Sequence, residues 1–406
     1  MRVGLPLLLV PCLLAADPVV VSSGPGNDYE SWIGRLGDGR LMVVFDRNPD
    51  WRSGDLYVTF SDDDGASWSA AAPIITGPAD QPLPCFLQLP GDTLRLWYSS
   101  NETGRYRIHS ARSLDGLSWT EEGVVPLGWP PETSDYYDPT VIIEPDSSLT
   151  MLYSVSTTGA HVARRPWGGE WDTLRRLVAE NGRRPRIMRH SDGRYLAAYQ
   201  RRSGGGSYDI DVFLRTSTDL VNWSQELRLT DNLNSHDPFC LEGPDGRFLV
   251  WYAKYQFGVY NLRLRRSVDG ADWGPEELVT ADPVRNTQPH AFIEDGVVYL
   301  VYAHAVAYPD DHDVLLRREP YLGIAGPGVR SPLSVSLPAV VRRGETLRPA
   351  GCGPGAWLEL FDAAGRAVLR SRADRGISSA GLATGAWFVR VHDAGRVVTC
   401  RVLVVE

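Results

Sequence analysis

The sequence predicts an all-β protein: a six-bladed β-propeller followed by a C-terminal immunoglobulin-like β-sandwich. First, a turn followed by an apolar strand recurs six times, beginning at Asp38, Asp92, Asp146, Asp192, Asp245 and Asp295. Second, a series of tryptophans runs in phase with these turns at intervals of 50 to 52 residues, at Trp68, Trp119, Trp171, Trp223 and Trp273. Third, apolar and polar residues alternate between glycine turns after residue 333. Units of four short strands that repeat about every 50 residues are typical of propeller blades.

The chain begins with a segment that has the layout of a secretory signal peptide. Arg2 supplies one positive charge, an apolar run covers residues 3–14, and the small residues Ala15 and Ala16 follow it. This run is too short to span a bilayer. We therefore predict a signal peptide over residues 1–16 and a protein that is secreted or displayed on a bacterial cell surface.

Composition argues against several classes of partner and cofactor. The chain of 406 residues carries a formal net charge of −9, which argues against a nucleic-acid partner because such proteins need a basic face to replace phosphate counterions. No second apolar run long enough to cross a membrane follows the first, so we expect no membrane insertion. No pair of cysteines has the spacing of metal ligands, and we expect no metal site and no cofactor.

Residues 17–320 are expected to close into a circle of blades. The sixth unit stops after its third strand, around Leu315, whereas an unpartnered apolar run at Val19 to Ser22 precedes the first unit. We predict that this run completes the sixth blade. Hydrogen bonds between the two ends of the domain would then leave no open sheet edge between the first and last blades.

A short motif follows the third strand of most units. It reads SerAspAspAspGlyAlaSerTrp from Ser61, SerLeuAspGlyLeuSerTrp from Ser113, SerThrAspLeuValAsnTrp from Ser217 and SerValAspGlyAlaAspTrp from Ser267. A hydroxyl and a carboxylate two residues apart can satisfy the amides of a turn, and the tryptophan packs beside the hairpin. The motif resembles the Asp-box, or BNR, repeat of the sialidase superfamily, and the resemblance covers residues 17–320. We assign the motif a structural role.

The candidate catalytic and substrate-binding residues are expected on one face of the predicted circle. Because strands alternate in direction, the starts of the innermost strands share a face with the loops that follow the second strands. Carboxylates, arginines and aromatic residues around one mouth suit a carbohydrate, and two carboxylates can act as acid and base or nucleophile. The catalytic candidates are Glu30, Asp50, Asp138 and Asp237, and the substrate-binding candidates are Tyr29, Arg47, Arg184, Arg186, Arg201, His236, Gln288 and His290. The alternative for each Asp-Pro pair among them is a turn or cap.

The sialidase resemblance implies both a mechanism and a discrepancy. Sialidases hold the carboxylate of their substrate with three arginines, a task that suits bidentate guanidinium contacts. Their first Arg-Ile-Pro segment corresponds to residues 29–33, where this chain has Glu30, and a carboxylate there would repel sialic acid. The loop after the second strand looks like the place where sialidases carry their acid/base aspartate, which makes Asp50 the first candidate and Asp55 the second.

A second resemblance competes with the first. SerThrAspLeuValAsnTrp and the Asp-Pro pairs that start inner strands look like those of the five-bladed arabinanase, xylosidase and fructosidase propellers. This resemblance implies three carboxylates near the axis, here Asp138, Asp237 and either Glu30 or Asp28. Six counted units argue against a five-bladed fold, so the resemblance serves as a hint about the class of ligand.

The end of the chain differs from the repeats. Residues 321–333 are predicted to be a linker rich in glycine and proline, and residues 334–406 a small β-sandwich. LeuPheAspAlaAlaGlyArg from Leu360 and GlyLeuAlaThrGlyAlaTrpPheValArgVal from Gly381 resemble the C-terminal sorting domains of bacterial type IX secretion. That resemblance implies a contact with the secretion machinery, and a plain immunoglobulin-like module is the alternative. Cys352 and Cys400 could form a disulfide if they lie on adjacent strands.

Together these features predict a secreted, sialidase-like propeller that acts on glycans as an exo-acting glycoside hydrolase, with an acid/base aspartate in its central cleft. The alternative is a non-catalytic glycan-binding or protein-interaction propeller that has lost the sialidase arginine triad. A glycan partner is common to the hydrolase and to the glycan-binding alternative. The oligomeric state does not follow from the sequence.

Overall fold

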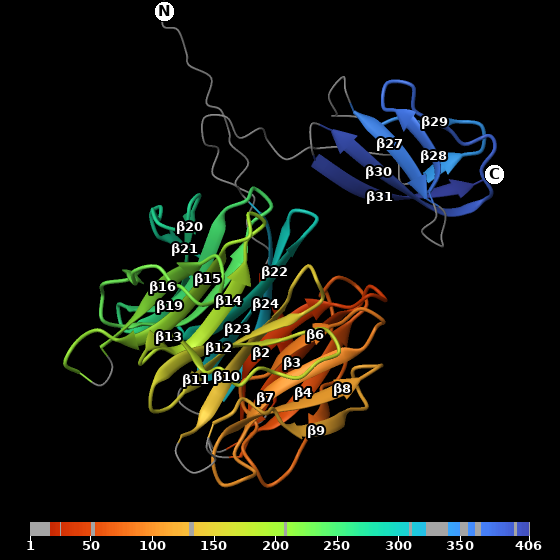
Figure 1. Ribbon diagram of the computed structural model, residues 1–406. Coiled ribbons are helices and arrows are strands. Elements are labelled where there is room, and N and C mark those ends of the chain that lie inside the picture. Colours follow the sequence, from red (N-terminus) through yellow and green to blue (C-terminus); the bar gives the residue numbers. More distant parts are fainter. Residues whose placement is uncertain are drawn as a thin grey trace, which may run out of the picture. The chain divides into compact units, whose positions relative to one another are not determined.

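The structure is a computed structural model that describes residues 17–24, 26–49, 53–129, 134–206, 209–307, 311–321, 340–349, 356–361, 367–393 and 396–405. Every regular element in these ranges is a β-strand, as predicted for an all-β protein (Figure 1). Over the same ranges there is accordingly no helix that could cross a membrane. The chain divides into two compact units, Met1–Tyr321 and Leu322–Glu406. The predicted signal peptide and the predicted linker residues 322–333 lie outside the described residues.

The first unit is built from antiparallel groups of four strands, of which the first and the last join into one eight-stranded sheet. The first sheet contains β2 (Asn27–Arg35), β3 (Leu41–Asn48), β4 (Asp55–Ser61) and β5 (Ala72–Ile75). The second contains β6 (Cys85–Gln88), β7 (Leu94–Ser100), β8 (Arg107–Ser113) and β9 (Thr120–Val124), and the third β10 (Tyr136–Ile143), β11 (Leu149–Val155), β12 (Gly159–Arg165) and β13 (Arg176–Glu180). The fourth contains β14 (Arg183–Arg189), β15 (Tyr195–Arg202), β16 (Ile210–Ser217) and β17 (Leu227–Arg228), and the fifth β18 (Ser235–Glu242), β19 (Phe248–Gln256), β20 (Val259–Ser267) and β21 (Glu277–Leu278).

The last strands of the unit come from both of its ends. They are β22 (Asn286–Glu294), β23 (Val297–Ala307), β24 (Asp311–Pro320) and, from the start of the chain, β1 (Val19–Ser22). β1 pairs antiparallel with β24, with Val19 opposite Leu316. The prediction that Val19–Ser22 completes the last group of strands is therefore confirmed. A single parallel bridge between Asn27 and His312 also joins this group to the first sheet.

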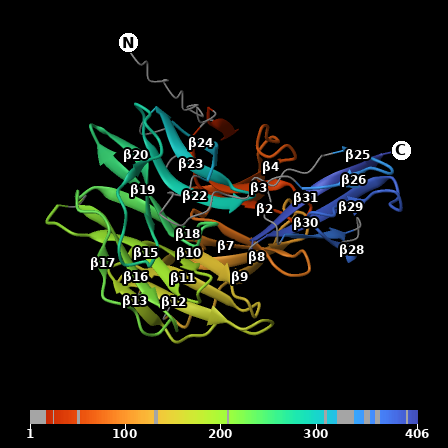
Figure 2. The ribbon, with the colours of Figure 1, turned by 90° about the horizontal axis from the view of Figure 1, so that it is seen from above.

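The inner strands form a closed circle. β2 packs against β6, β6 against β10, β10 against β14, β14 against β18, β18 against β22, and β22 against β2. Figure 2 shows the sheets following one another in chain order around a common centre. The second strands are almost continuous apolar runs because neighbouring sheets cover both of their faces, and β11 is buried at every residue. Met42, Leu96 and Met151 illustrate this packing, since they share one core cluster across three sheets.

A buried network fixes the closure of the circle beside β1. Ser22 Oγ donates to Asp28 Oδ2 at 2.6 Å, and Arg47 donates to Asp28 Oδ1 and Oδ2 at 2.6 and 2.7 Å. Arg47, a substrate-binding candidate, therefore holds the first strands of the chain together. Asp28, which was considered as a third axial carboxylate, is fully buried in this network.

The closure by β1 leads to a stability prediction. Val21 is 4% exposed, whereas its neighbour Val20 is 51% exposed. Replacing Val21 with Asp should lower the free energy of unfolding by at least about 3 kcal/mol, because an ionised carboxylate cannot be solvated there. Val20→Asp is the matched control and should change it by less than about 0.5 kcal/mol. Chemical denaturation measures both, and equal losses would show that β1 does not close the circle.

The motifs that resemble Asp boxes close turns between the third and fourth strands. In the second sheet, the N–H of Gly116 donates to Ser113 Oγ at 2.9 Å and that of Ser118 to Asp115 Oδ1 at 2.7 Å. Such backbone bonds lower the pKa of the Asp115 carboxyl to about 2. Trp119 Nε1 donates to the carbonyl of Gly116 at 2.9 Å. The motifs that begin at residues 217 and 267 repeat the two backbone bonds, so the carboxylates serve the turns, as predicted.

The second unit contains a five-stranded sheet and a two-stranded pair. The sheet order is β25 (Val340–Arg342), β31 (Arg396–Val405), β30 (Gly385–Asp393), β27 (Trp357–Phe361) and β28 (Ala367–Arg372), and the pair is β26 (Thr346–Leu347) with β29 (Ile377–Ser378). Leu358, Leu360 and Val389 lie in its core. Cys352 lies outside the described residues, so the disulfide with Cys400 stays a prediction, as does the immunoglobulin-like sandwich.

Candidate functional site

Six residues of the first unit share an unusual backbone conformation. Five of them lie within the first four residues of an inner strand, and Leu83 lies two residues before β6. Each has a φ between 46° and 63°, a conformation that costs a residue other than glycine about 1 kcal/mol or more. At five of these six residues the pairing register between the inner and second strands shifts, as in a β-bulge. We call these residues the axial ring: Glu30, Leu83, Asp138, Arg184, Asp237 and Gln288.

Hydrogen bonds connect the axial ring from one sheet to the next. The N–H of Leu83 donates to Glu30 Oε2 at 2.9 Å, and the N–H of Arg184 donates to Asp138 Oδ2 at 3.1 Å. The N–H of Glu30 donates to Gln288 Oε1 at 3.0 Å, which links the first inner strand to the last. These hydrogen bonds offset the free-energy cost of the strained backbone, and they fix each ring residue relative to its neighbour.

Two residues on second strands accept two further ring N–H groups. They replace the side chains of Leu83 and Arg184, which have no hydrogen-bond acceptor. Ser99 Oγ accepts the N–H of Asp138 at 3.2 Å, and Gln200 Oε1 accepts the N–H of Asp237 at 2.7 Å. The N–H groups of five ring residues are therefore each satisfied by a polar side chain of the preceding sheet around the circle: those of Glu30, Leu83, Asp138, Arg184 and Asp237. These bonds explain how the strained conformation can recur from one sheet to the next.

Arg184 is the cation of the axial ring. Its Nη2 lies 2.9 Å from Glu30 Oε1, and its Nε lies 3.3 Å from Asp237 Oδ1. Burial works to lower the pKa of Arg184, but the carboxylates of Glu30, Asp237 and Asp138 raise it overall, so the guanidinium stays charged. One guanidinium is thereby held among three carboxylates.

The three ring carboxylates differ in exposure. Glu30 and Asp138 are buried, whereas Asp237 is partly exposed. Burial raises the pKa of Glu30, and the nearby Arg184 only partly offsets this effect. Asp138 Oδ2 accepts a hydrogen bond from Ser154 Oγ at 2.8 Å, while its Oδ1 has no hydrogen-bond partner among the described residues. Asp237 is consequently the ring carboxylate that a ligand can reach most easily.

An acidic cluster lies beside Glu30. Asp46 on β3 is fully buried and stands opposite Tyr29 in the β2–β3 ladder. Its burial, and then the carboxylates of Glu30 and Asp80, raise the pKa of Asp46 well above its ordinary value. Asp80 accepts a hydrogen bond from the hydroxyl of Tyr106. Burial also raises the pKa of Tyr29, so its hydroxyl stays a hydrogen-bond donor.

Sequence reasoning missed Asp46 and Asp80. A signal for each was present in the chain. Asp46 directly continues the apolar strand of residues 41–45, where a carboxylate is out of place unless it serves a site. Asp80 lies in the connection from the first to the second sheet, and such connections reach the same face as the starts of the inner strands.

A ligand would bind at the face where the inner strands begin. The cavity lined by the axial ring except Asp138 has a volume of about 20 Å³, which holds a water molecule and is too small for a sugar ring. Aromatic side chains gather at that face. The ring centroids of Tyr106 and Tyr137 are 6.3 Å apart, and those of His236 and Tyr260 are 5.4 Å apart. We call this aromatic face the mouth.

Arg186 and His290 lie further along the inner strands than the axial ring. Arg186 Nη1 donates to Thr140 Oγ1 at 3.2 Å. The ring of His290 lies 3.8 Å from that of Trp32, and its Nδ1 accepts the N–H of Ile33 at 3.2 Å. Burial lowers the pKa of His290 well below its ordinary value, so the imidazole is neutral. These contacts give both candidates a part in the packing of the inner strands.

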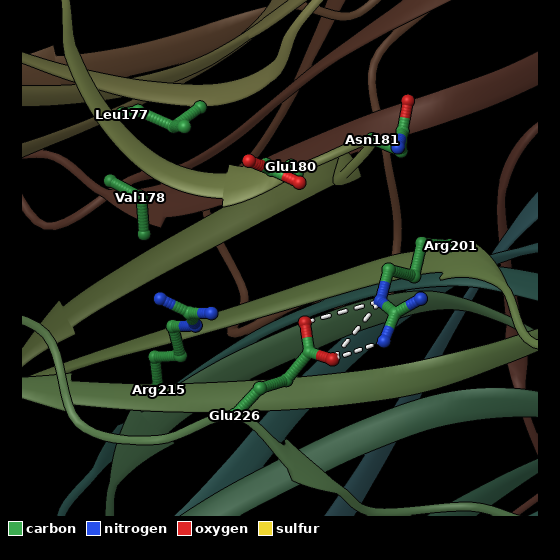
Figure 3. Close-up of a pocket in the computed structure, with 7 residues that line it drawn as sticks. All are labelled: Leu177, Val178, Glu180, Asn181, Arg201, Arg215 and Glu226. Carbon is green, nitrogen blue, oxygen red and sulfur yellow. Dashed lines mark hydrogen bonds and ion pairs between the residues drawn. The ribbon is translucent and has the colours of Figure 1, made fainter.

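Arg201 lies away from the axial ring. It pairs with Glu226 in a cavity of about 370 Å³ that is also lined by Leu177, Val178, Glu180, Asn181 and Arg215 (Figure 3). Tyr199 Oη donates to the same Glu226 at 2.6 Å. The fifth sheet repeats this arrangement, because Tyr252 Oη and Lys254 Nζ both donate to Glu276, at 2.7 and 3.0 Å. The ion pair of Arg201 with Glu226 is therefore one instance of an arrangement that recurs from sheet to sheet.

The structure thus brings five of the predicted site residues together and separates others. Glu30, Asp138, Arg184, Asp237 and Gln288 all belong to the axial ring. Tyr29 and His236 precede two of them by one residue. Asp50 lies outside the described residues, so its role as acid/base stays a prediction.

Solved structures share the fold of the first unit. A protein of unknown function from Dyadobacter fermentans is 17% identical, with a TM-score of 0.63, over 77% of this chain and all of its own. The α-L-arabinanase of Penicillium chrysogenum, solved with arabinobiose, is 17% identical, with a TM-score of 0.56, over 76% of this chain and 99% of its own. The NanB sialidase of Streptococcus pneumoniae, as its K499G mutant, is 9% identical, with a TM-score of 0.61, over 76% of this chain and 72% of its own.

No protein-family model matches the sequence, and no curated protein matches it. The likenesses are therefore structural. They establish an all-β fold of the kind found in propeller glycoside hydrolases.

Proposed function

We propose that this chain is a secreted glycoside hydrolase with a six-bladed propeller, and that it acts on a neutral glycan at the axial ring. The observation that carries the proposal is the charged Arg184 held among three carboxylates beneath an aromatic mouth. Carboxylates supply acid, base or nucleophile to glycosidic cleavage, and aromatic rings bind sugar faces. The structural likeness to an arabinanase, an arabinofuranosidase and a sialidase supports the same class of reaction.

The exposed members of the axial ring would contact the sugar. Arg184 and Asp237 are partly exposed, so Arg184 binds hydroxyl groups and Asp237 acts as base or nucleophile. Asp50 is the acid that the sialidase resemblance implies. The buried Glu30 and Asp138 are positioning residues, because they hold Arg184 through an ion pair and a backbone bond.

The charge of the site favours a neutral substrate. Burial raises the pKa of Asp46, and the carboxylates of Glu30 and Asp80 lie close enough to raise it further. A sialic acid carboxylate brought to this acidic cluster would be repelled. Arabino-oligosaccharides are the first probes to use, since an arabinanase and an arabinofuranosidase solved with arabinobiose share the fold.

Glycan binding without hydrolysis is the second candidate. It is favoured by the hydrogen bonds of Glu30, whose two carboxylate oxygens are both occupied by neighbouring groups of the axial ring. The experiment that separates the two uses the purified mature chain on a glycan array and on a panel of aryl glycosides. Release of aglycone supports the hydrolase. Binding without release supports the second candidate, and the absence of both signals overturns both.

We also propose that residues 334–406 direct export across the outer membrane. The support is the resemblance of the segments from Leu360 and Gly381 to type IX sorting domains. A reporter protein fused to residues 334–406 is expected in the medium, or on the surface, of a bacterium with that secretion system. Equal amounts inside the cells of the wild type and of a secretion-deficient strain would refute the role.

A further inference from the structure

The hairpin between β19 and β20 ends in an unusual turn. Gln256 pairs with Val259, so Phe257 and Gly258 alone form the loop. Their φ values are 54° and 92°, and two positive values in succession are typical of a type I′ turn. That turn favours asparagine followed by glycine, and a bulky aromatic side chain at its first position is strained.

Among the described residues, Phe257 is also the most exposed large apolar side chain. It is 94% exposed, which leaves its ring in water. The residue therefore combines a strained backbone with an unburied aromatic surface, and packing among the described residues compensates for neither. Strain of this kind is retained where it serves a contact outside the chain.

A row of aromatic side chains leads from the axial ring toward the hairpin that carries Phe257. Tyr255, which is 42% exposed, lies 5.1 Å from Tyr260 between ring centroids. Tyr260 lies 5.4 Å from His236, the residue directly before Asp237. The hydroxyl of Tyr260 and Nε2 of His236 both bond to the side chain of Asn234, which fixes the two rings.

The hairpin projects from the mouth. β18 begins at Ser235, which pairs with Lys254 of β19, and the hairpin continues past this pair to Phe257. The row of rings thus starts beside a reachable carboxylate of the proposed site and reaches Tyr255, two residues before Phe257 in the turn. We call Tyr255, Phe257 and Tyr260 the aromatic tip.

We propose that the aromatic tip is a stacking platform for a polysaccharide chain, and that it holds the sugar units beyond the one at the axial ring. This inference rests on the proposed function and extends it from a single sugar to a polymer. Sugar rings have apolar faces that stack on aromatic side chains, and a row of rings in line with the site suits a linear chain. An anionic membrane is a poor match because the chain has a net charge of −9.

The test uses Phe257→Asn in the full mature chain. Asparagine suits the type I′ turn, so the variant should be at least as stable as the wild type, and any loss of binding cannot come from misfolding. The matched control is Val268→Asn, since Val268 is 66% exposed and lies just beyond the other end of β20. Both variants and the wild type are compared on an array of polysaccharides and on their mono- and disaccharides, with linear arabinan and arabinobiose among the probes.

We expect Phe257→Asn to weaken polysaccharide binding about three- to tenfold and to leave binding of the small sugars unchanged. Val268→Asn should change neither. Equal polysaccharide binding by Phe257→Asn and the wild type would overturn the platform and leave the proposed function standing. Loss of small-sugar binding in Phe257→Asn would also overturn it, because the tip would then act on the axial ring. If the wild type binds no glycan, both the platform and the proposed function fail. Phe257-dependent binding to lipid vesicles alone would assign the tip to a membrane.

Discussion

Arg184→Met should be the most destabilising single change in the axial ring. The guanidinium pairs with Glu30 and Asp237, and its removal leaves a buried carboxylate without a cation. Breaking a buried pair in this way costs about 3–5 kcal/mol at neutral pH. Urea denaturation at pH 7.5 measures the loss.

The pH dependence identifies the source of that loss. Burial already raises the pKa of Glu30 in the folded protein, and the loss of Arg184 raises it further above the unfolded value. A carboxyl group with a raised folded pKa lowers stability at high pH and has no such effect once the pH is below its unfolded value, near 4. The deficit of the variant relative to the wild type should therefore shrink as the pH falls from 7.5 to 5.

A control variant separates this effect from the general loss of an arginine. Arg105 pairs with Asp135 at 3.8 Å, and Arg105 is exposed while Asp135 is partly exposed. Arg105→Met should cost less than about 1 kcal/mol at either pH. A deficit of Arg184→Met that is the same at pH 5 and pH 7.5 would show that unpaired carboxylates are not responsible.

Asp237→Asn should abolish most of the proposed hydrolysis while the protein stays folded. Removal of a general base or nucleophile lowers turnover by about 10²- to 10⁴-fold. The fold should tolerate the change, because Asp237 is partly exposed and its N–H bond to Gln200 is kept. The measurement is kcat on the aryl glycoside or oligosaccharide that the screen identifies, together with the thermal unfolding midpoint.

Glu277→Gln is the control for Asp237→Asn on the same sheet. Glu277 pairs with Arg266 at 2.8 Å on the outer strand, far along the sheet from the axial ring. Its replacement should leave turnover within about twofold of the wild type. Turnover of Asp237→Asn within threefold of the wild type would remove Asp237 from the mechanism. If the wild type only binds glycan, the same variant should lose affinity instead.

Local chemistry made much of the fold predictable. The hydroxyl and carboxylate of each Asp box bond to amides within a few residues, so the motif can be recognised without knowledge of the rest of the chain. The unpaired strand at Val19–Ser22 was assigned correctly because the last unit lacked one strand and a free apolar run stood at the other end. Both inferences depend on counting repeats and on short-range hydrogen bonds.

The site was predictable only in part. Placing the starts of the inner strands on one face was enough to group Glu30, Asp138, Arg184 and Asp237, because a strand's direction fixes which end of it reaches that face. The same argument also selected Arg201, yet its side chain pairs with Glu226 at the flank of the sheet. Strand direction alone did not identify Asp46, because its burial next to Glu30 depends on how neighbouring strands pack. Strand direction gives the face, but packing decides which side chains meet.

The sequence by itself determined the all-β class, the repeat, the strand that closes the circle and the face on which polar residues gather, because these depend on local periodicity and turn chemistry. Only the tertiary structure decided that Glu30 bonds to Gln288 and pairs with Arg184, which lie 258 and 154 positions away along the chain. Such contacts form when the circle closes, and the free energy of each depends on burial that no short stretch of sequence contains.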